Sequence, residues 1–336
     1  MFNTVTNQQA KATADHLQAA LQPNKQGFVP DYNIPLLATG GGNSQPETLS
    51  ALGPLADLIG TWASARFAGF NVMPLPQETA PEGVILFNFP YYEVITFSAT
   101  QGKVVNRGGD YQQNSYTIFY EQRVFFADGY KKDQLVHAEN GTWLNLATTN
   151  QGSGKYNRPP YIPAPSGGAN VPIQNPEHAI VKQVSIPHGN SILALGNHHF
   201  VDGRPEIPIA NTLPQPETKA GTAIAGLYGE NSPSNPNINP NIVLEQQLLV
   251  NQAYNPITKT DILTVNSDND GLVSSIPFCK NHVDVPNFST TYWIERLSSG
   301  ALQLQYTQNI SLQFNNTKNS KLLFPHITAN TLFKVG

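Results

Sequence analysis

The sequence predicts an all-β protein built around a closed antiparallel up-and-down barrel of about ten strands. Charged residues make up only 12% of the 336 residues, whereas exposed helix positions normally carry Lys, Glu and Arg. The 26 glycines and 27 prolines favour many turns. Segments with strand composition also follow one another without the intervening helices that parallel strands need. These three observations favour an antiparallel sheet that closes on itself.

Residues 301–314, ALQLQYTQNISLQF, carry the clearest strand pattern. Apolar and polar residues alternate over more than a dozen positions, which is the period of an extended strand with one buried face. A strand of this length suits a meander or barrel better than a small sandwich. The residues that face one way are Leu302, Leu304, Tyr306, Ile310, Leu312 and Phe314.

The remaining elements form a short helical lead-in followed by the barrel. Apolar spacing predicts helices at 4–22 and within 46–60, so residues 1–54 are interpreted as a helical or extended lead-in and 55–336 as the barrel domain. Other strands are predicted at 84–98, 115–126, 134–147, 178–185, 190–196, 243–250, 260–266, 290–297 and 326–335.

Two long segments read as insertions in the barrel, at 150–176 and 204–241. Both are rich in Pro, Gly and Asn and are too long for simple hairpin connections. The second contains apolar residues that can anchor it to the barrel, namely Ile207, Ile209, Ile224 and Leu227. We expect these segments to cover one barrel mouth or to mediate self-association as a homo-oligomer.

Composition and charge exclude several classes of partner. The formal net charge of −4, with no run of Lys or Arg, lacks the basic surface that nucleic-acid binding needs. No apolar run approaches a membrane span and no signal-peptide pattern begins the chain, so we expect no membrane partner and a cytoplasmic location. Cys279 is the only cysteine, which excludes an intramolecular disulfide and a cysteine-based zinc or iron–sulfur site.

Four motifs occur in a recognisable order. They are Gly60-Thr61-Trp62, the paired strands ending in His137-Ala138-Glu139, the hairpin around Pro187-His188-Gly189, and the closing segment LFPHITANTLFK. Together they resemble nitrobindin and its bacterial relatives, small haem-binding β-barrels related in architecture to fatty-acid-binding proteins. The resemblance spans roughly residues 55–335 when the insertions are set aside.

The resemblance implies a haem b site with His326 as the ligand of the iron. Neutral imidazole is a strong iron ligand, and one histidine suffices for pentacoordinate haem. It also implies binding of nitric oxide or the removal of reactive nitrogen and oxygen species, with peroxynitrite isomerase-like or peroxidase-like activity. The residues that it places around the pocket are His137, His188, Thr61, Trp62, Tyr120 and Phe125.

Other interpretations of these residues stay open. His326 can be a rim histidine bonded to the backbone or to water, and His188 can be a simple turn residue. His137 and Glu139 lie two residues apart on one strand face, so they form either a polar pair in the pocket or an ion pair at a strand end. No catalytic triad is evident, and the catalytic residues stay unassigned.

Two further functions therefore compete with haem binding. The stretch Ala63-Ser64-Ala65-Arg66 replaces the small glycine-rich steps of the resembled family, which favours a calycin-like carrier of a small apolar ligand that performs no catalysis. An isomerase or cyclase that uses His137 and Glu139 for proton transfer is the third possibility.

Two clusters look like metal sites but have simpler explanations. His198 and His199 should face opposite sides of a strand, which separates their rings. The segment NSDNDG at 266–271 begins like a calcium loop, but Pro277 stands where a bidentate Glu would be needed, and a hairpin turn is predicted there instead.

Overall fold

A computed structural model describes residues 46–100, 102–108, 111–148, 178–217, 219–315 and 317–335. The predicted helix at 4–22 and the insertion at 150–176 lie outside these residues.

The described chain forms a closed antiparallel barrel of ten staves, as the sequence predicts. Closure occurs at the first stave, which is broken into two short strands that both pair with the second stave and with the last. The staves, in chain order, are β1 (Gly60–Ser64) with β2 (Gly69–Val72), β5 (Phe89–Ala99), β7 (Tyr111–Phe126), β8 (Leu135–Thr148), β9 (Ile180–Ile186), β10 (Asn190–Asp202), β11 (Ile257–Asn266), β13 (Val283–Leu297), β14 (Leu302–Phe314) and β15 (Phe324–Lys334).

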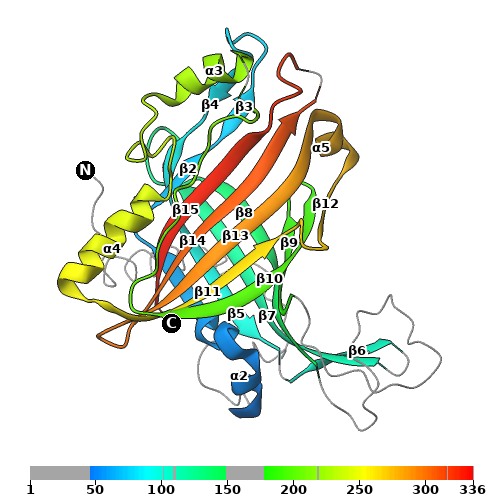
Figure 1. The fold of residues 1–336 in the computed structure, drawn as a ribbon, viewed down its shortest axis with the longest axis vertical. Coiled ribbons are helices and arrows are strands. Elements are labelled where there is room, and N and C mark those ends of the chain that lie inside the picture. The colour runs from blue at the N-terminus through cyan, green and yellow to red at the C-terminus, as the bar shows by residue number, and fades with distance from the viewer. Residues whose placement is uncertain are drawn as a thin grey trace, which may run out of the picture.

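The other elements extend or cover the barrel (Figure 1). β3 and β4 form a separate hairpin, β6 pairs with β7, and β12 pairs with β10. Their bounds, with those of the helices, are β3 (Pro74–Pro76), β4 (Val84–Leu86), β6 (Val104–Gly108), β12 (Leu272–Ser275), α2 (Pro46–Leu52), the 3₁₀ helices η1 (Gly53–Leu58) and η2 (Gly226–Tyr228), α3 (Lys219–Ala225), α4 (Ile242–Tyr254) and α5 (Pro277–His282).

The two faces of β14 show how alternation sorts residues in this barrel. Leu304 and Tyr306 point inward and join the main core. Gln303 and Gln305 point outward but are fully buried, because α4 covers this part of the outer surface. The polar face of the strand is therefore under a helix and not in water.

α4 corrects the predicted strand at 243–250. The residues that it buries are Val243, Leu244, Gln247, Leu248 and Asn251, a spacing of three and four that belongs to a helix. Val243, Leu244 and Leu248 pack on the outer face of the barrel in a cluster that includes Trp293 and Phe333. Packing against distant parts of the chain therefore decides for a helix here.

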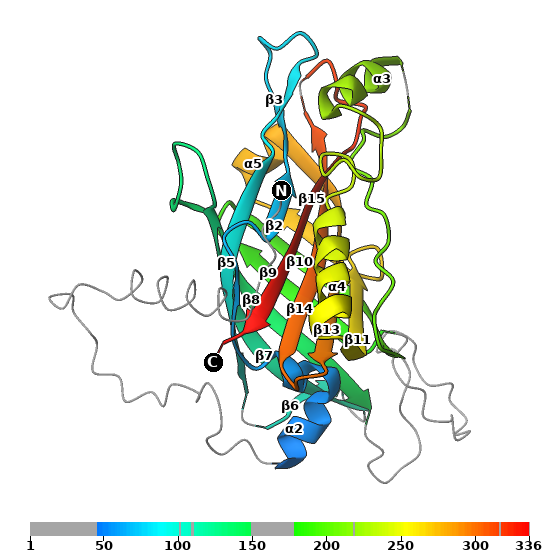
Figure 2. The same ribbon diagram turned by 90° about the vertical axis from the view of Figure 1, so that its left-hand side faces the viewer.

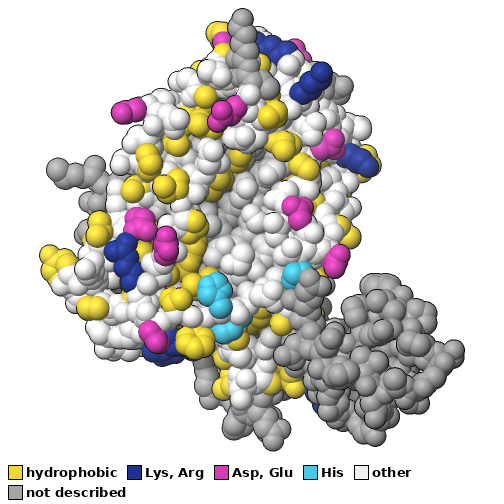
Figure 3. Space-filling model, in the orientation of Figure 1, with side chains coloured by type: hydrophobic (Ala, Val, Ile, Leu, Met, Phe, Trp, Pro, Cys, Tyr) yellow, Lys and Arg dark blue, Asp and Glu magenta, His cyan; other side chains and the backbone are white. Residues whose placement is uncertain are grey.

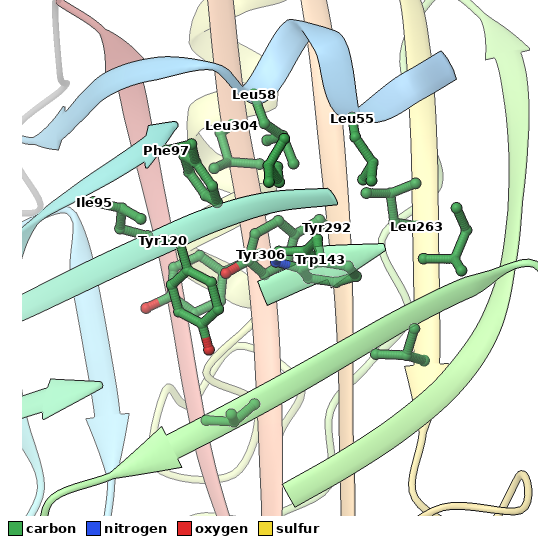
Figure 4. Close-up of a cluster of buried hydrophobic side chains, with 14 of the residues drawn as sticks. Leu55, Leu58, Ile95, Phe97, Tyr120, Trp143, Leu263, Tyr292, Leu304 and Tyr306 are labelled. Carbon is green, nitrogen blue, oxygen red and sulfur yellow. The ribbon is translucent and has the colours of Figure 1, made fainter. Parts of the chain in front are cut away.

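One end of the barrel is plugged by α2 and η1. Leu52, Leu55 and Leu58 have no solvent exposure and belong to the main core. Trp62 anchors the plug, because its indole Nε1 donates a hydrogen bond of 2.6 Å to the carbonyl of Leu58. Figure 4 shows Leu55 and Leu58 pointing from this helical segment towards the barrel side chains.

The opposite end carries β3, β4, α3 and η2 (Figure 2). Ile224 and Tyr228 pack there against Phe324 at the start of β15. In the predicted insertion at 204–241, Ile207 is also buried against the barrel, whereas Ile209 is 67% exposed and Leu227 is 45% exposed. This segment thus packs on the barrel through two of its four predicted anchors.

The NSDNDG segment is a bulge and not the predicted hairpin turn. β11 ends opposite Leu195 of β10, and β12 begins opposite Leu193, so both run in the same direction along one stave. Residues 267–271 loop out between them. The Asx-rich composition indicated a turn correctly, but not that the chain would continue in its original direction.

The surface is sparsely charged. On the face shown in Figure 3, the side chains of Lys and Arg and those of Asp and Glu are few and scattered. Within the described ranges, no helix is long and apolar enough to cross a membrane.

Candidate functional site

The barrel interior near the plug is filled with large apolar side chains. Trp143 and Tyr292 lie at its centre with ring centroids 4.9 Å apart, and neither is more than 1% exposed. Figure 4 shows these rings together with Tyr120 and Tyr306 inside the barrel. These rings and the leucines of the plug belong to one buried core cluster.

Glu139 is a buried carboxylate at the middle of the barrel, and four side chains bind it. Tyr120 Oη and Lys182 Nζ donate to Oε1 over 2.8 and 3.1 Å, and Gln308 Nε2 donates to Oε2 over 3.4 Å. His137 Nε2 lies 3.4 Å from Oε2. Burial alone would raise the pKa of Glu139, but the charge of Lys182 and these hydrogen bonds hold it well below its ordinary value. Glu139 is therefore ionised at neutral pH.

Lys182 supplies the counter-charge from β9. Its side chain has no solvent exposure, and Nζ also donates to Gln308 Oε1 over 3.1 Å. The ammonium lies 5.1–5.6 Å from the centres of four aromatic rings, those of Tyr120, Trp143, Phe288 and Tyr292. The faces of aromatic rings attract a cation, so these four rings partly replace the hydration that the Lys182 ammonium loses on burial.

A second buried carboxyl, Glu93 on β5, is bound by neutral side chains. Asn330 Nδ2 donates to its Oε1 over 2.7 Å, and Gln122 donates to Oε2. Burial raises the pKa of Glu93 to about 7, although these hydrogen bonds oppose the shift. The hydroxyls of Tyr91 and Tyr306, 2.9 Å apart, continue this network. The interior thus holds one ionised carboxylate and one carboxyl that titrates near neutrality.

Three of the predicted site histidines meet at the end of the barrel opposite the plug, which we call the histidine end. His137 lies near the start of β8, His188 in the turn between β9 and β10, and His326 near the start of β15. The rings of His137 and His188 have centroids 5.6 Å apart. His326 lies at the same end, on β15, and the charges of the other two rings lower its pKa.

His326 faces the interior beside Asn71 of β2. Its Nε2 donates to Asn71 Oδ1 over 2.8 Å. The ring is half-buried, so it keeps some contact with solvent while protein surrounds it. Burial, and then the charges of His137 and His188, lower the pKa of His326 to about 4, which makes it neutral at pH 7. Asn71 Nδ2 is buried with no hydrogen-bond partner among the described residues.

The structure separates the other predicted site residues from this end. Tyr120 points inward, but its hydroxyl is bound to Glu139 in the middle of the barrel. Trp62 is in the core at the plugged end, and Thr61, on the opposite face of β1, contacts Thr96. Phe125 faces outward, where it stacks on Tyr92 with centroids 5.4 Å apart. The surface ion-pair interpretation of His137 and Glu139 is wrong, because Glu139 is 1% exposed.

Sequence reasoning missed most of the polar interior. Lys182, Glu93, Gln308 and Asn330 all occupy inward positions between apolar residues of their strands. The signal was present in segments such as IVKQVSI, where Lys182 shares a face with Ile180 and Val184. A charged residue on the apolar face of a strand indicates a buried partner.

The structure places no group of three or more His, Cys, Asp or Glu side chains suitably for a metal ion, as far as the described residues go. His198 pairs with Asp261 over 2.9 Å near the plugged end. His199 pairs with Ile262 on the other face of β10, which separates the two rings as predicted.

Fold and interior together define the class of protein. It is a closed ten-stranded antiparallel up-and-down β-barrel, a fold that can hold a small ligand. No protein-family model matches the chain, and no curated protein matches it. Among solved structures, the crystal structure of Rv2717c from M. tuberculosis is similar, with 13% sequence identity, 84% of this chain and 96% of that chain covered, and a TM-score of 0.38. A likeness of this size does not assign the chain to a family.

Proposed function

We propose that the protein binds a small, mainly apolar molecule with at least one polar group at the histidine end of the barrel. The observation that carries this proposal is the position of His137, His188 and His326 at the end of the barrel opposite the leucine plug, where none of the three side chains is fully buried. An apolar recess with a few converging polar groups is the usual form of a small-molecule site.

Half-buried side chains along the last two staves support the same place. Ile310, Leu312 and Thr328 point to the interior side of β14 and β15, yet each keeps partial solvent exposure. Core residues deeper on the same faces, such as Leu304 and Leu332, have none. Solvent therefore reaches part of this face where His326 lies.

Binding can be tested by nuclear magnetic resonance during titration with the apolar probe 1-anilinonaphthalene-8-sulfonate. We expect the imidazole signals of His137, His188 and His326 to shift together and to saturate. The signals of His198 and His199, near the plugged end, serve as the internal control and should stay in place. Shifts confined to the control pair would refute the proposed site.

Haem is a second candidate ligand, favoured by the neutral imidazole of His326. A neutral ring offers a lone pair to iron, and Asn71 is placed to orient it. The imidazole of His326 is therefore a suitable ligand for haem iron. Its Nε2 is hydrogen-bonded to Asn71, so ligation through this atom requires that hydrogen bond to break. When bound, a ferric haem would supply a site for nitric oxide, and binding of nitric oxide or removal of reactive nitrogen species stays part of this candidate.

Optical spectroscopy separates the two candidates. If haem binds through His326, reconstituted protein shows a Soret band that His326→Ala shifts or abolishes, while His198→Ala leaves it unchanged. If wild type and His326→Ala give the same spectrum, the axial ligand assignment is wrong, and the carrier function stands alone.

A further inference from the structure

One side of the histidine end consists of a histidine backed by an ionised carboxylate. His137 and Glu139 lie two residues apart on β8, so the strand places both side chains on the inner face. His137 Nε2 is 3.4 Å from Glu139 Oε2. A histidine oriented in this way by a carboxylate keeps its other ring nitrogen directed away from the carboxylate.

The surroundings of Glu139 decide which residue of the pair a ligand can reach. Tyr120, Lys182 and Gln308 bind the carboxylate from the core side, and its side chain has no solvent exposure. The His137 side chain is 26% exposed, so it is the member of the pair that a ligand can reach. A reachable base held by a buried orienting group is the arrangement of general-base catalysis.

The other side of the histidine end offers hydrogen-bonding groups of low charge. His326 is neutral at pH 7 and is held by Asn71, while His188 lies beside His137. The one N–H of the neutral His326 ring is already donated to Asn71, so the free donor for a carbonyl oxygen on which negative charge develops is Asn71 Nδ2, which has no hydrogen-bond partner among the described residues.

We infer that the histidine end is a proton-transfer site in which His137 is the catalytic residue and Glu139 the positioning residue. The substrate class is an apolar carbonyl compound with a hydrogen on the carbon next to the carbonyl and a double bond one position further along. The inference rests on the proposed function, because such a compound must first bind at this end.

The reaction balances without any added reagent. The bond between hydrogen and the carbon beside the carbonyl breaks, the proton moves to the free ring nitrogen of His137, and the electron pair is delocalised onto the carbonyl oxygen. Return of that proton to the far carbon of the former double bond restores neutral His137 and gives a conjugated isomer. Nothing is oxidised or reduced.

The probe for this activity is 5-nitrobenzisoxazole. A general base removes its carbon-bound hydrogen, the nitrogen–oxygen bond breaks, and a coloured phenolate is released. We expect saturable turnover by the wild-type protein, and a loss of about 100-fold in kcat/KM for His137→Ala. The matched control is His198→Ala, which removes a histidine that is also paired with a carboxylate but lies near the plugged end. This control should keep the wild-type rate.

A second pair of variants tests Glu139 while keeping buried charge balanced. Glu139→Gln combined with Lys182→Met removes both members of the ion pair. We expect this protein to keep its affinity for 1-anilinonaphthalene-8-sulfonate, while kcat for the probe falls and KM stays close to wild type. Added imidazole should restore part of the rate of His137→Ala, which a merely structural defect would not allow.

The failures of the two proposals are distinguishable. If the fluorescent probe binds with shifts of the three histidines, but 5-nitrobenzisoxazole turns over no faster than in free imidazole, only the proton-transfer inference is overturned. Equal losses in His137→Ala and His198→Ala would overturn it as well. If the fluorescent probe does not bind at all, the proposed function fails and the inference fails with it.

Discussion

At the residue scale, the ion pair between Lys182 and Glu139 is the clearest energetic feature of the interior. Each side chain is fully buried, and the two atoms Nζ and Oε1 are 3.1 Å apart. Removing one partner leaves an uncompensated charge in the core, which costs far more than removing both. The stability of the polar interior therefore depends on the presence of both charged side chains.

A double-mutant cycle measures this dependence. We expect Glu139→Gln and Lys182→Met to lower the free energy of unfolding by about 3–5 kcal/mol each. The double variant should lose much less than the sum, because neither charge is left alone. Urea unfolding of the four proteins supplies the comparison, and additive losses would show that the two groups do not stabilise each other.

Glu295 gives the protein a predicted sensitivity to alkaline pH. It is fully buried beneath α4, Gln303 Nε2 donates to its Oε2 over 2.6 Å, and Oε1 has no partner among the described residues. Burial raises its pKa from 4.5 to about 8. The stabilisation from the neutral carboxyl is complete below the unfolded-state pKa and is lost as the pH rises through about 8.

The free energy of unfolding should accordingly fall between about pH 5.5 and pH 8.5, by on the order of a few kcal/mol. Glu295→Gln keeps the shape and the hydrogen bond with Gln303 but cannot titrate, so its loss over the same range should be smaller. Glu93, with its pKa raised to about 7, contributes to the remaining slope. Denaturant midpoints at the two pH values test this, and equal slopes in wild type and Glu295→Gln would contradict it.

At the element scale, α4 stabilises the barrel from outside. Leu244 is fully buried against the outer face, whereas Leu249 on the same helix is 59% exposed. We expect Leu244→Ala to lower the free energy of unfolding by about 2–4 kcal/mol, and Leu249→Ala to change it by less than about 0.5 kcal/mol. Thermal unfolding of this matched pair is the measurement. Equal effects would show that α4 does not depend on this face.

The elements also show what the sequence could and could not predict. Strands with clean alternation, such as β14, were predicted closely, because period-two patterning reflects the inside and outside of the barrel directly. α4 was predicted as a strand. Its buried Gln247 and Asn251 interrupt the apolar stripe of the helix, and Asn251 donates to Gln303 of β14, a partner that only the fold reveals. Prediction from the local sequence pattern fails where buried side chains are polar and their partners lie far away in the sequence.

The candidate site also contains residues that were predicted correctly and one that was not. His326, His137 and His188 were placed together from motif order, and the structure brings them together. Phe125 was placed in the pocket but faces outward, because it lies an odd number of residues after the inward-facing Tyr120 on the same regular strand, β7. A shift of one residue reverses the face of a strand.

At the scale of the whole molecule, the barrel has two unlike ends. α2 and η1 fill one end with leucines, and the interior above them is aromatic. The other end holds the three histidines and half-buried residues of β14 and β15. The account's central claim is that this second end binds a small molecule, and two neighbouring positions on β14 test it.

Ile310 points into the barrel beside His326, whereas Ser311 is the next residue and points outward. Ile310→Trp should fill the recess and weaken the binding of 1-anilinonaphthalene-8-sulfonate by at least about tenfold, equivalent to about 1.4 kcal/mol. Ser311→Trp adds the same bulk on the outer side and should bind the probe as wild type does. Fluorescence titration of the three proteins gives the answer directly. Unweakened binding in Ile310→Trp, or equal weakening in both variants, would contradict a ligand site at the histidine end.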